Sequence, residues 1–114
     1  MTLSLEKTWV AVCPADAVPE WSGAAALLDS GEQVAIFHLP GQRWFGLANL
    51  DPCSGAAVLS RGIIGDAGGV PVVASPVYKE RFDLRTGVCL DEDGVSVRVY
   101  PVRLNEGVVE VGSP

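Results

Sequence analysis

The sequence predicts a single all-β domain, an antiparallel β-sandwich or small barrel, and three observations favour it. Helical periodicity is almost absent along the chain. Short apolar runs rich in β-branched and aromatic residues recur instead, as is typical of strands. Turn residues separate these runs at about 8 to 12 residues, the spacing of sandwiches and barrels. With 114 residues, 48% of them hydrophobic, we expect one domain over 1–114 with its core in about 8–112.

The first half of the chain predicts hairpin strands. Residues 24–28 form one strand and residues 33–39 the return strand, because Asp-Ser-Gly-Glu between them is typical of a turn. A Pro-Gly-Gln turn then leads to a strand over 44–50. The following stretch, 51–69, is rich in glycine and has no clear periodicity, so we expect it to be largely loop.

Two further strands follow the glycine-rich stretch. Residues 70–74 form a short apolar strand, and residues 81–85 alternate between apolar and charged side chains. This alternation places Phe82 and Leu84 on the core face and Asp83 on the solvent face.

The C-terminal part predicts a hairpin and one long strand. A short strand at 88–90 precedes Asp93-Gly94, a strong hairpin-turn pair. The strand over 95–104 changes the parity of its apolar residues at Tyr100-Pro101, where we expect a bulge or bend because proline cannot donate to the ladder. Residues 108–111 close the domain.

Charge and hydropathy exclude two classes of partner. The net charge is −6 and the eight Lys and Arg residues are scattered, whereas nucleic-acid binders carry basic patches. No apolar run approaches the roughly 20 residues that cross a bilayer. The N-terminus lacks the apolar stretch of a signal peptide, so we expect a cytoplasmic protein without a membrane or nucleic-acid partner.

The cysteines and the histidine predict no catalytic or metal centre. Cys13, Cys53 and Cys89 are an odd number at wide spacing, without the close Cys/His pairs of a zinc site. We expect them to be small buried apolar residues, and the sequence leaves their reactivity open. His38, the one histidine, has no nucleophile near it in sequence, so we expect a packed or edge histidine rather than a base.

The segment 62–69 (GIIGDAGG) invites comparison with a phosphate-binding loop. No Lys-Ser or Lys-Thr pair follows it, and no strand-to-helix transition frames it. We interpret it as a flexible surface loop, although a binding module for a small anion remains an open alternative.

Two loops carry the most specific pattern. One reads Asn-Leu-Asp-Pro-Cys-Ser-Gly-Ala at 49–56, and the other reads Ala-Ser-Pro-Val-Tyr at 74–78. Arg-Phe-Asp-Leu-Arg-Thr-Gly follows at 81–87. This frame resembles the two cluster-holding loops of Rieske [2Fe–2S] proteins, which implies a Rieske-like fold with two protruding loops.

The resemblance identifies the positions at which that family holds its cluster. There, a Cys-x-His in the first loop and a Cys-x-x-His in the second bind the two irons. The corresponding residues are Asp51 and Cys53 in the first loop and Ser75 and Tyr78 in the second. None of the four keeps the ligand of the family, so we expect no metal, no bound cofactor and no catalytic residue in this chain.

Within that family, five segments resemble the small subunits of NAD(P)H-dependent assimilatory nitrite reductases. This implies a non-catalytic subunit whose partner is a large subunit carrying FAD, a [4Fe–4S] cluster and siroheme, which reduces nitrite to ammonia. The sequence leaves open whether NADH or NADPH is the electron donor, and it leaves open the stoichiometry of the subunits. The segments are 34–37, 49–52, 58–65, 74–79 and 99–103.

The paired loops also supply a candidate docking tip, because interfaces combine apolar and aromatic anchors with a polar rim. The candidate tip consists of Pro52, Pro76, Val77 and Tyr78, ringed by Lys79, Glu80 and Arg81.

The alternative function is a Rieske-type ferredoxin that passes electrons to an oxygenase, and the four replaced ligands argue against it.

Overall fold

The computed structural model describes residues 8–113, which contain ten strands and two short 3₁₀ turns. Residues 1–7 and 114, which the predicted 1–114 domain and the signal-peptide argument include, lie outside it. The elements in chain order are β1 (Trp9–Pro14), η1 (Ala15–Ala17), β2 (Ser22–Leu27), β3 (Gln33–Leu39), β4 (Arg43–Ala48), η2 (Leu59–Arg61), β5 (Ile63–Ala67), β6 (Val70–Ala74), β7 (Arg81–Asp83), β8 (Val99–Tyr100), β9 (Val102–Asn105) and β10 (Val108–Gly112).

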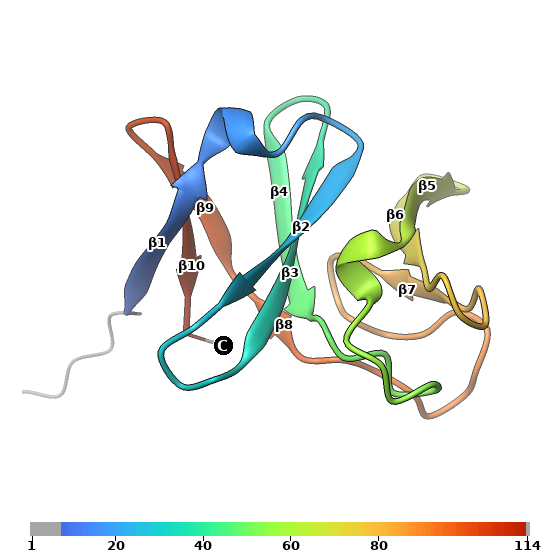
Figure 1. Ribbon diagram of the computed structural model, residues 1–114. Coiled ribbons are helices and arrows are strands. Elements are labelled where there is room, and N and C mark those ends of the chain that lie inside the picture. The colour runs from blue at the N-terminus through green and yellow to red at the C-terminus, as the bar shows by residue number, and fades with distance from the viewer. Residues whose placement is uncertain (1–7, 114) are drawn as a thin grey trace, which may run out of the picture.

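The strands form three antiparallel sheets that lie side by side (Figure 1). A sheet of order β2-β3-β4-β8 lies between a β1-β10-β9 sheet and a β5-β6-β7 sheet. The predicted all-β antiparallel fold is confirmed. No helix within residues 8–113 has the length and apolar character needed to cross a membrane.

β3 is the central strand, and both of its faces are buried. Ala35, Phe37 and Leu39 point to one hydrophobic core, whereas Val34 and Ile36 point to another. This explains why the strand reads as a nearly continuous apolar run, and its bounds match the predicted strand over 33–39. The two cores therefore hold the flanking sheets against opposite faces of the same strand.

The first core connects the central sheet with the loop-bearing sheet. It joins Phe37 and Leu47 of the central sheet to Val73 and Phe82 of β6 and β7, and Leu59 of η2 completes it. All five side chains are fully buried. The loops that follow β4 and β6 are thus anchored at their bases by well-packed apolar residues.

Pro101 marks the place where the chain passes from one sheet to the next. β8 before it pairs with β4, and β9 after it pairs with β10. The predicted bend at Tyr100-Pro101 is confirmed, because the proline interrupts the ladder. The predicted long strand over 95–104 is wrong in its first part, since residues 95–98 lie outside the assigned strands and Ser96 makes only an isolated bridge to Val88.

The glycine-rich segment 62–69 is not the loop that the sequence predicted. Ile63 and Ile64 pair with Ala74 and Val73, so β5 and β6 form a hairpin. Its turn is Gly68-Gly69, whose φ angles of 64° and 94° favour glycine. Gly65 in the middle of the strand concealed the strand pattern.

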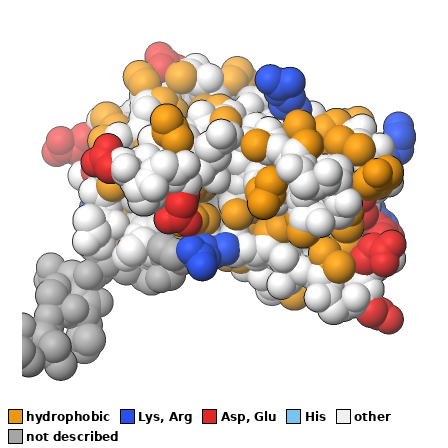
Figure 2. Space-filling view, turned by 60° about the horizontal axis from the view of Figure 1, so that its bottom comes forward, with side chains coloured by type: hydrophobic (Ala, Val, Ile, Leu, Met, Phe, Trp, Pro, Cys, Tyr) orange, Lys and Arg blue, Asp and Glu red, His pale blue; other side chains and the backbone are white. Residues whose placement is uncertain are grey.

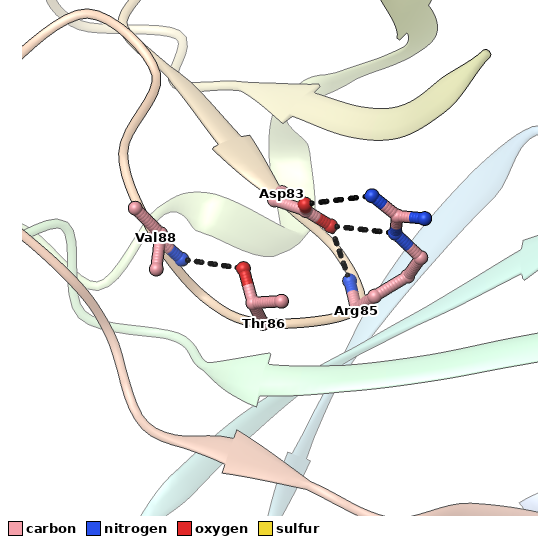
Figure 3. Close-up of polar contacts among 4 residues, drawn as sticks. All are labelled: Asp83, Arg85, Thr86 and Val88. Atoms are coloured by element: carbon pink, nitrogen blue, oxygen red, sulfur yellow. Dashed lines mark hydrogen bonds and ion pairs between the residues drawn. The ribbon is translucent and has the colours of Figure 1, made fainter.

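The prediction that Asp83 lies on the solvent face is wrong, because its side chain is buried. β7 ends at Asp83, where the chain turns and the alternation stops. The Asp83 carboxylate accepts hydrogen bonds from the Arg85 backbone N–H at 2.8 Å and from its guanidinium at 3.1 and 3.2 Å (Figure 3). Burial acts to raise the Asp83 pKa, but these bonds outweigh it and lower the pKa. In the same turn, the Val88 N–H donates to Thr86 Oγ1.

Candidate functional site

The first loop, between β4 and η2, is closed by its own backbone. The Asp51 N–H donates to the Ala56 carbonyl at 2.8 Å, and the Gly55 N–H donates back to the Asp51 carbonyl at 2.7 Å. Gly55 has a φ of 76°, which allows this tight return. The carboxylate of Asp51 is therefore held at a fixed place at the base of the loop.

The second loop, between β6 and β7, is closed in a similar way. The Ser75 N–H donates to the Glu80 carbonyl at 2.9 Å, and the Lys79 N–H donates to the Ser75 carbonyl at 3.0 Å. Ser75 and Glu80 are thereby paired across the base of the loop. Both have buried side chains, whereas the residues between them are exposed.

The Asp51 carboxylate joins the two loops. Its Oδ2 accepts hydrogen bonds from Ser75 Oγ at 2.5 Å and from Ser54 Oγ at 2.9 Å, while Oδ1 accepts the Cys53 N–H at 2.9 Å. Asp51 and Ser75 are both buried. Burial acts to raise the Asp51 pKa, but the hydrogen bonds from Ser75, Cys53 and Ser54 outweigh it and lower the pKa. The loops are thus connected by a charge-assisted hydrogen bond.

Glu80 is the residue of this site whose burial the sequence did not predict. It was placed in the exposed rim of the docking tip, but only 6% of it is exposed. Its Oε1 is buried and has no hydrogen-bond partner among residues 8–113. Burial and the neighbouring Asp51 raise the Glu80 pKa. The periodicity of the surrounding charged residues gave no sign of this burial, which follows from the closure of the loop on Ser75.

The three cysteines differ in exposure. Cys89 is buried, as expected, but Cys13 is only half-buried and Cys53 is exposed at the tip of the first loop, so the prediction of buried residues holds fully for Cys89 alone. Desolvation and the negative charges of Glu80 and Asp51 raise the Cys53 pKa. One carboxylate oxygen of each acid and the Cys53 Sγ lie within 4.8 Å of one another.

His38 is a packed residue, in agreement with the sequence prediction. Its ring stacks on Trp44 of the neighbouring strand, with 4.0 Å between ring centroids. Its Nδ1 lies 2.7 Å from the Val18 carbonyl oxygen. These contacts explain the residue without a catalytic role.

The residues at the four cluster-ligand positions do not fit a [2Fe–2S] cluster. Such a cluster of the Rieske type needs two thiolates on one iron and two imidazoles on the other. Asp51 and Ser75 occupy the two thiolate positions and are hydrogen-bonded to each other. Cys53 and Tyr78 occupy the two imidazole positions. The set offers one sulfur and no imidazole, so it does not suit a Rieske cluster.

The residues at the tips of the loops are exposed. Tyr78 has 67% of its surface exposed, and Pro52, Pro76 and Val77 are exposed as well. Figure 2 shows hydrophobic side chains gathered over the right-hand part of the face in view, with acidic and basic side chains around that part. Further exposed apolar residues that the sequence did not single out are Leu50, Ile63, Val88 and Leu90.

The two basic candidates of the tip differ in their surroundings. Lys79 is exposed, lies at the end of the loop and has a φ of 64°, in the left-handed region. Arg81 forms a two-pronged ion pair with Asp91, at 2.8 and 3.0 Å, and its backbone N–H also donates to that carboxylate. These bonds lower the Asp91 pKa to about 2. The charge of Arg81 is thereby compensated within the chain.

Three antiparallel sheets with two loops paired at one end define a Rieske-like domain, and residues 8–112 match the family described as Rieske-like [2Fe-2S] domain. The nitrite reductase (NADH) small subunit of Salmonella typhimurium is 40% identical, with 90% of this chain and 95% of that protein covered. The chain belongs to the family of NAD(P)H nitrite reductase small subunits.

A solved structure from Mycobacterium tuberculosis, which carries the name of an NADH-dependent nitrite reductase small subunit, has a TM-score of 0.91 and 44% identity. It covers 96% of this chain and 97% of its own. A Sphingomonas yanoikuyae ferredoxin, at a TM-score of 0.76 and 21% identity, shares the fold. The fold is therefore common to this ferredoxin and to the small subunits.

A larger relative contains the same domain. The nitrite reductase [NAD(P)H] large subunit of Klebsiella oxytoca is 45% identical over 107 residues, which are 94% of this chain. The chain spans 11% of that protein.

Proposed function

We propose that this chain is the small subunit of an NAD(P)H-dependent nitrite reductase and acts by docking on a large redox subunit. The observation that carries the proposal is the Klebsiella large subunit, in which a domain 45% identical to this chain is part of the same polypeptide. Domains joined in one chain in one organism and separate in another commonly work in one complex. The separate chain then needs a surface that replaces the covalent connection.

The redox chemistry belongs to the partner in this proposal. The large subunit is expected to carry FAD, a [4Fe–4S] cluster and siroheme, and to reduce nitrite to ammonia with electrons from NAD(P)H. The small chain then contributes contact, and the donor set of its loops supports this because it does not suit a Rieske cluster. The ferredoxin alternative is disfavoured for the same reason. A cytoplasmic location remains part of the proposal.

We assign the docking to the loop tip: Pro52, Pro76, Val77 and Tyr78, with Lys79 and Arg81 beside them. An exposed tyrosine between exposed apolar residues provides a large anchor with a polar end. The bases of both loops are buried and hydrogen-bonded, so the tip is presented on a rigid support. A rigid surface loses little conformational entropy on binding.

The test is co-expression of this chain with a tagged large subunit, followed by measurement of affinity and of NAD(P)H-dependent nitrite reduction. Tyr78→Ala is expected to weaken association by about 2 kcal/mol, which is about 30-fold in Kd. Leu27→Ala is the matched control, because Leu27 is 71% exposed but lies in the β2-β3 hairpin of the central sheet. It is expected to leave the Kd unchanged.

The outcomes separate the parts of the proposal. Failure of the wild-type chain to associate with the large subunit would refute the subunit assignment. Association that Tyr78→Ala and Val77→Ala both leave unchanged would refute the loop tip as the docking surface, while the subunit assignment would stand.

A further inference from the structure

We propose that Asp51, Cys53 and Glu80 form a site for a single divalent metal ion of the zinc class, at the place where the two loops meet. One carboxylate oxygen of Asp51, one of Glu80 and the Cys53 Sγ lie within 4.8 Å of one another. Ligands of a tetrahedral zinc lie about 2.0 to 2.3 Å from the ion, so a small inward movement brings all three into range. The site differs from a Rieske cluster because it holds one ion and no sulfide.

The strongest support is Glu80, whose side chain is buried in the site without its full set of partners. Only 6% of Glu80 is exposed, and its Oε1 has no hydrogen-bond partner in the described part of the chain. A buried carboxyl oxygen without a partner destabilises the fold, and more so when the carboxyl is charged. A cation placed between Glu80 and Asp51 would remove this cost.

Charge compensation also favours a cation. The four ion pairs within residues 8–113 involve other acids, and no Lys or Arg side chain there hydrogen-bonds to Asp51 or Glu80. Asp51 accepts three hydrogen bonds, from Cys53 N–H, Ser54 and Ser75. A carboxylate has about four lone-pair positions, and the fourth faces the Glu80 carboxyl, so an ion bound there would lie between the two acids.

The ligand types select the metal. One thiolate with two carboxylates suits zinc or cobalt(II), whereas Mg²⁺ and Ca²⁺ need a shell of oxygens only. Cys53 is exposed, so the fourth position opens to solvent and takes a water. Binding replaces the proton of the Cys53 thiol, so protons are released as the ion binds.

The experiment is a titration of the full chain with Co²⁺ under nitrogen, after removal of metals with a chelator. Thiolate-to-cobalt charge transfer gives a near-ultraviolet band, which is expected to saturate at one equivalent. One equivalent of Zn²⁺ is expected to abolish the band, and an excess of Mg²⁺ to leave it unchanged. Titrations in buffers of different ionisation enthalpy give the number of protons released.

Three variants decide the assignment. Cys53→Ser is expected to remove the band, and it lies at an exposed position where the change spares the fold. Cys13→Ser is the matched control and is expected to keep the band. Glu80→Gln keeps the size and hydrogen-bonding capacity of the side chain and is expected to weaken Co²⁺ binding at least about tenfold.

Either of two results would overturn the site. One is a wild-type chain without a band that saturates at one equivalent. The other is a band that Cys53→Ser leaves intact. Neither result affects the docking proposal, which is measured by association with the large subunit.

Discussion

The hydrogen bond between Ser75 and Asp51 is expected to make a measurable contribution to the stability of the fold. Ser75→Ala removes the hydroxyl that donates to Asp51 Oδ2 at 2.5 Å from the opposite loop. Both side chains are buried, so water cannot easily replace the lost donor. The change removes one oxygen and leaves almost no cavity, so the loss of the hydrogen bond dominates its effect.

The magnitude follows from the partners that remain. A hydrogen bond to a charged group contributes about 1.5 to 3 kcal/mol. Asp51 keeps its bonds from the Cys53 N–H and Ser54, so its carboxylate is not left without partners. We therefore expect Ser75→Ala to lower the free energy of unfolding by about 2 kcal/mol. For a domain of this size the corresponding decrease in Tm is about 8 °C.

Urea unfolding followed by circular dichroism measures this difference, with the chelator present so that metal binding does not contribute. Ser54→Ala is the matched control, because Ser54 donates to the same Oδ2 from within its own loop and is half-buried. We expect it to cost less than about 1 kcal/mol. A Ser75→Ala loss below about 0.5 kcal/mol would show that the connection between the loops does not stabilise the fold.

Three further predictions concern other parts of the chain. Gly87 and Gly94 both have a φ of 77°, but a Cβ on Gly87 would lie 2.1 Å from the Val97 carbonyl oxygen, whereas one on Gly94 meets nothing within 4 Å. Gly87→Ala should therefore cost about 3 kcal/mol or more and Gly94→Ala about 1, as measured by urea unfolding; equal losses would contradict this packing. The Asp91 pKa of about 2 lies below its unfolded value, so the Arg81–Asp91 pair contributes stability above about pH 4 and loses it as the pH falls toward 2. Comparing the pH dependence of wild type with Asp91→Asn tests this, and identical curves between pH 4 and 2 would refute it. Finally, the chain purified without oxygen should show no visible absorption band and no stoichiometric iron or acid-labile sulfide; two irons and two sulfides per chain would mean that Cys53 and its neighbours hold a cluster after all.

The sequence correctly predicted the strands whose residues and flanking turns form a clear local pattern. β3 and β6 match the predicted bounds 33–39 and 70–74, because continuous β-branched runs between turn residues are unambiguous. β5 was missed because Gly65 interrupts its apolar pattern. The segment is a strand because it pairs with β6, and that pairing cannot be read from the segment alone. The sequence also could not show that the chain changes sheets at Pro101, because that depends on which strands accept β8 and β9.

The site was predicted in part. The four degenerate ligand positions were identified from the loop pattern, and the structure places Asp51 and Ser75 in contact. The burial of Asp83 was missed because alternation in a strand that ends after three residues placed it on the solvent face. The burial of Glu80 was missed because it was assigned to the polar rim of the docking tip. Local periodicity cannot indicate burial that arises from loops folding back on each other.

The connection between the loops also bears on how the subunit matures. In a Rieske protein the cluster itself joins the two loops, because each loop supplies ligands to it. Here a serine hydroxyl and an aspartate carboxylate, both encoded in the chain, close the same gap as soon as the polypeptide folds. The two loops are therefore joined without iron or sulfide.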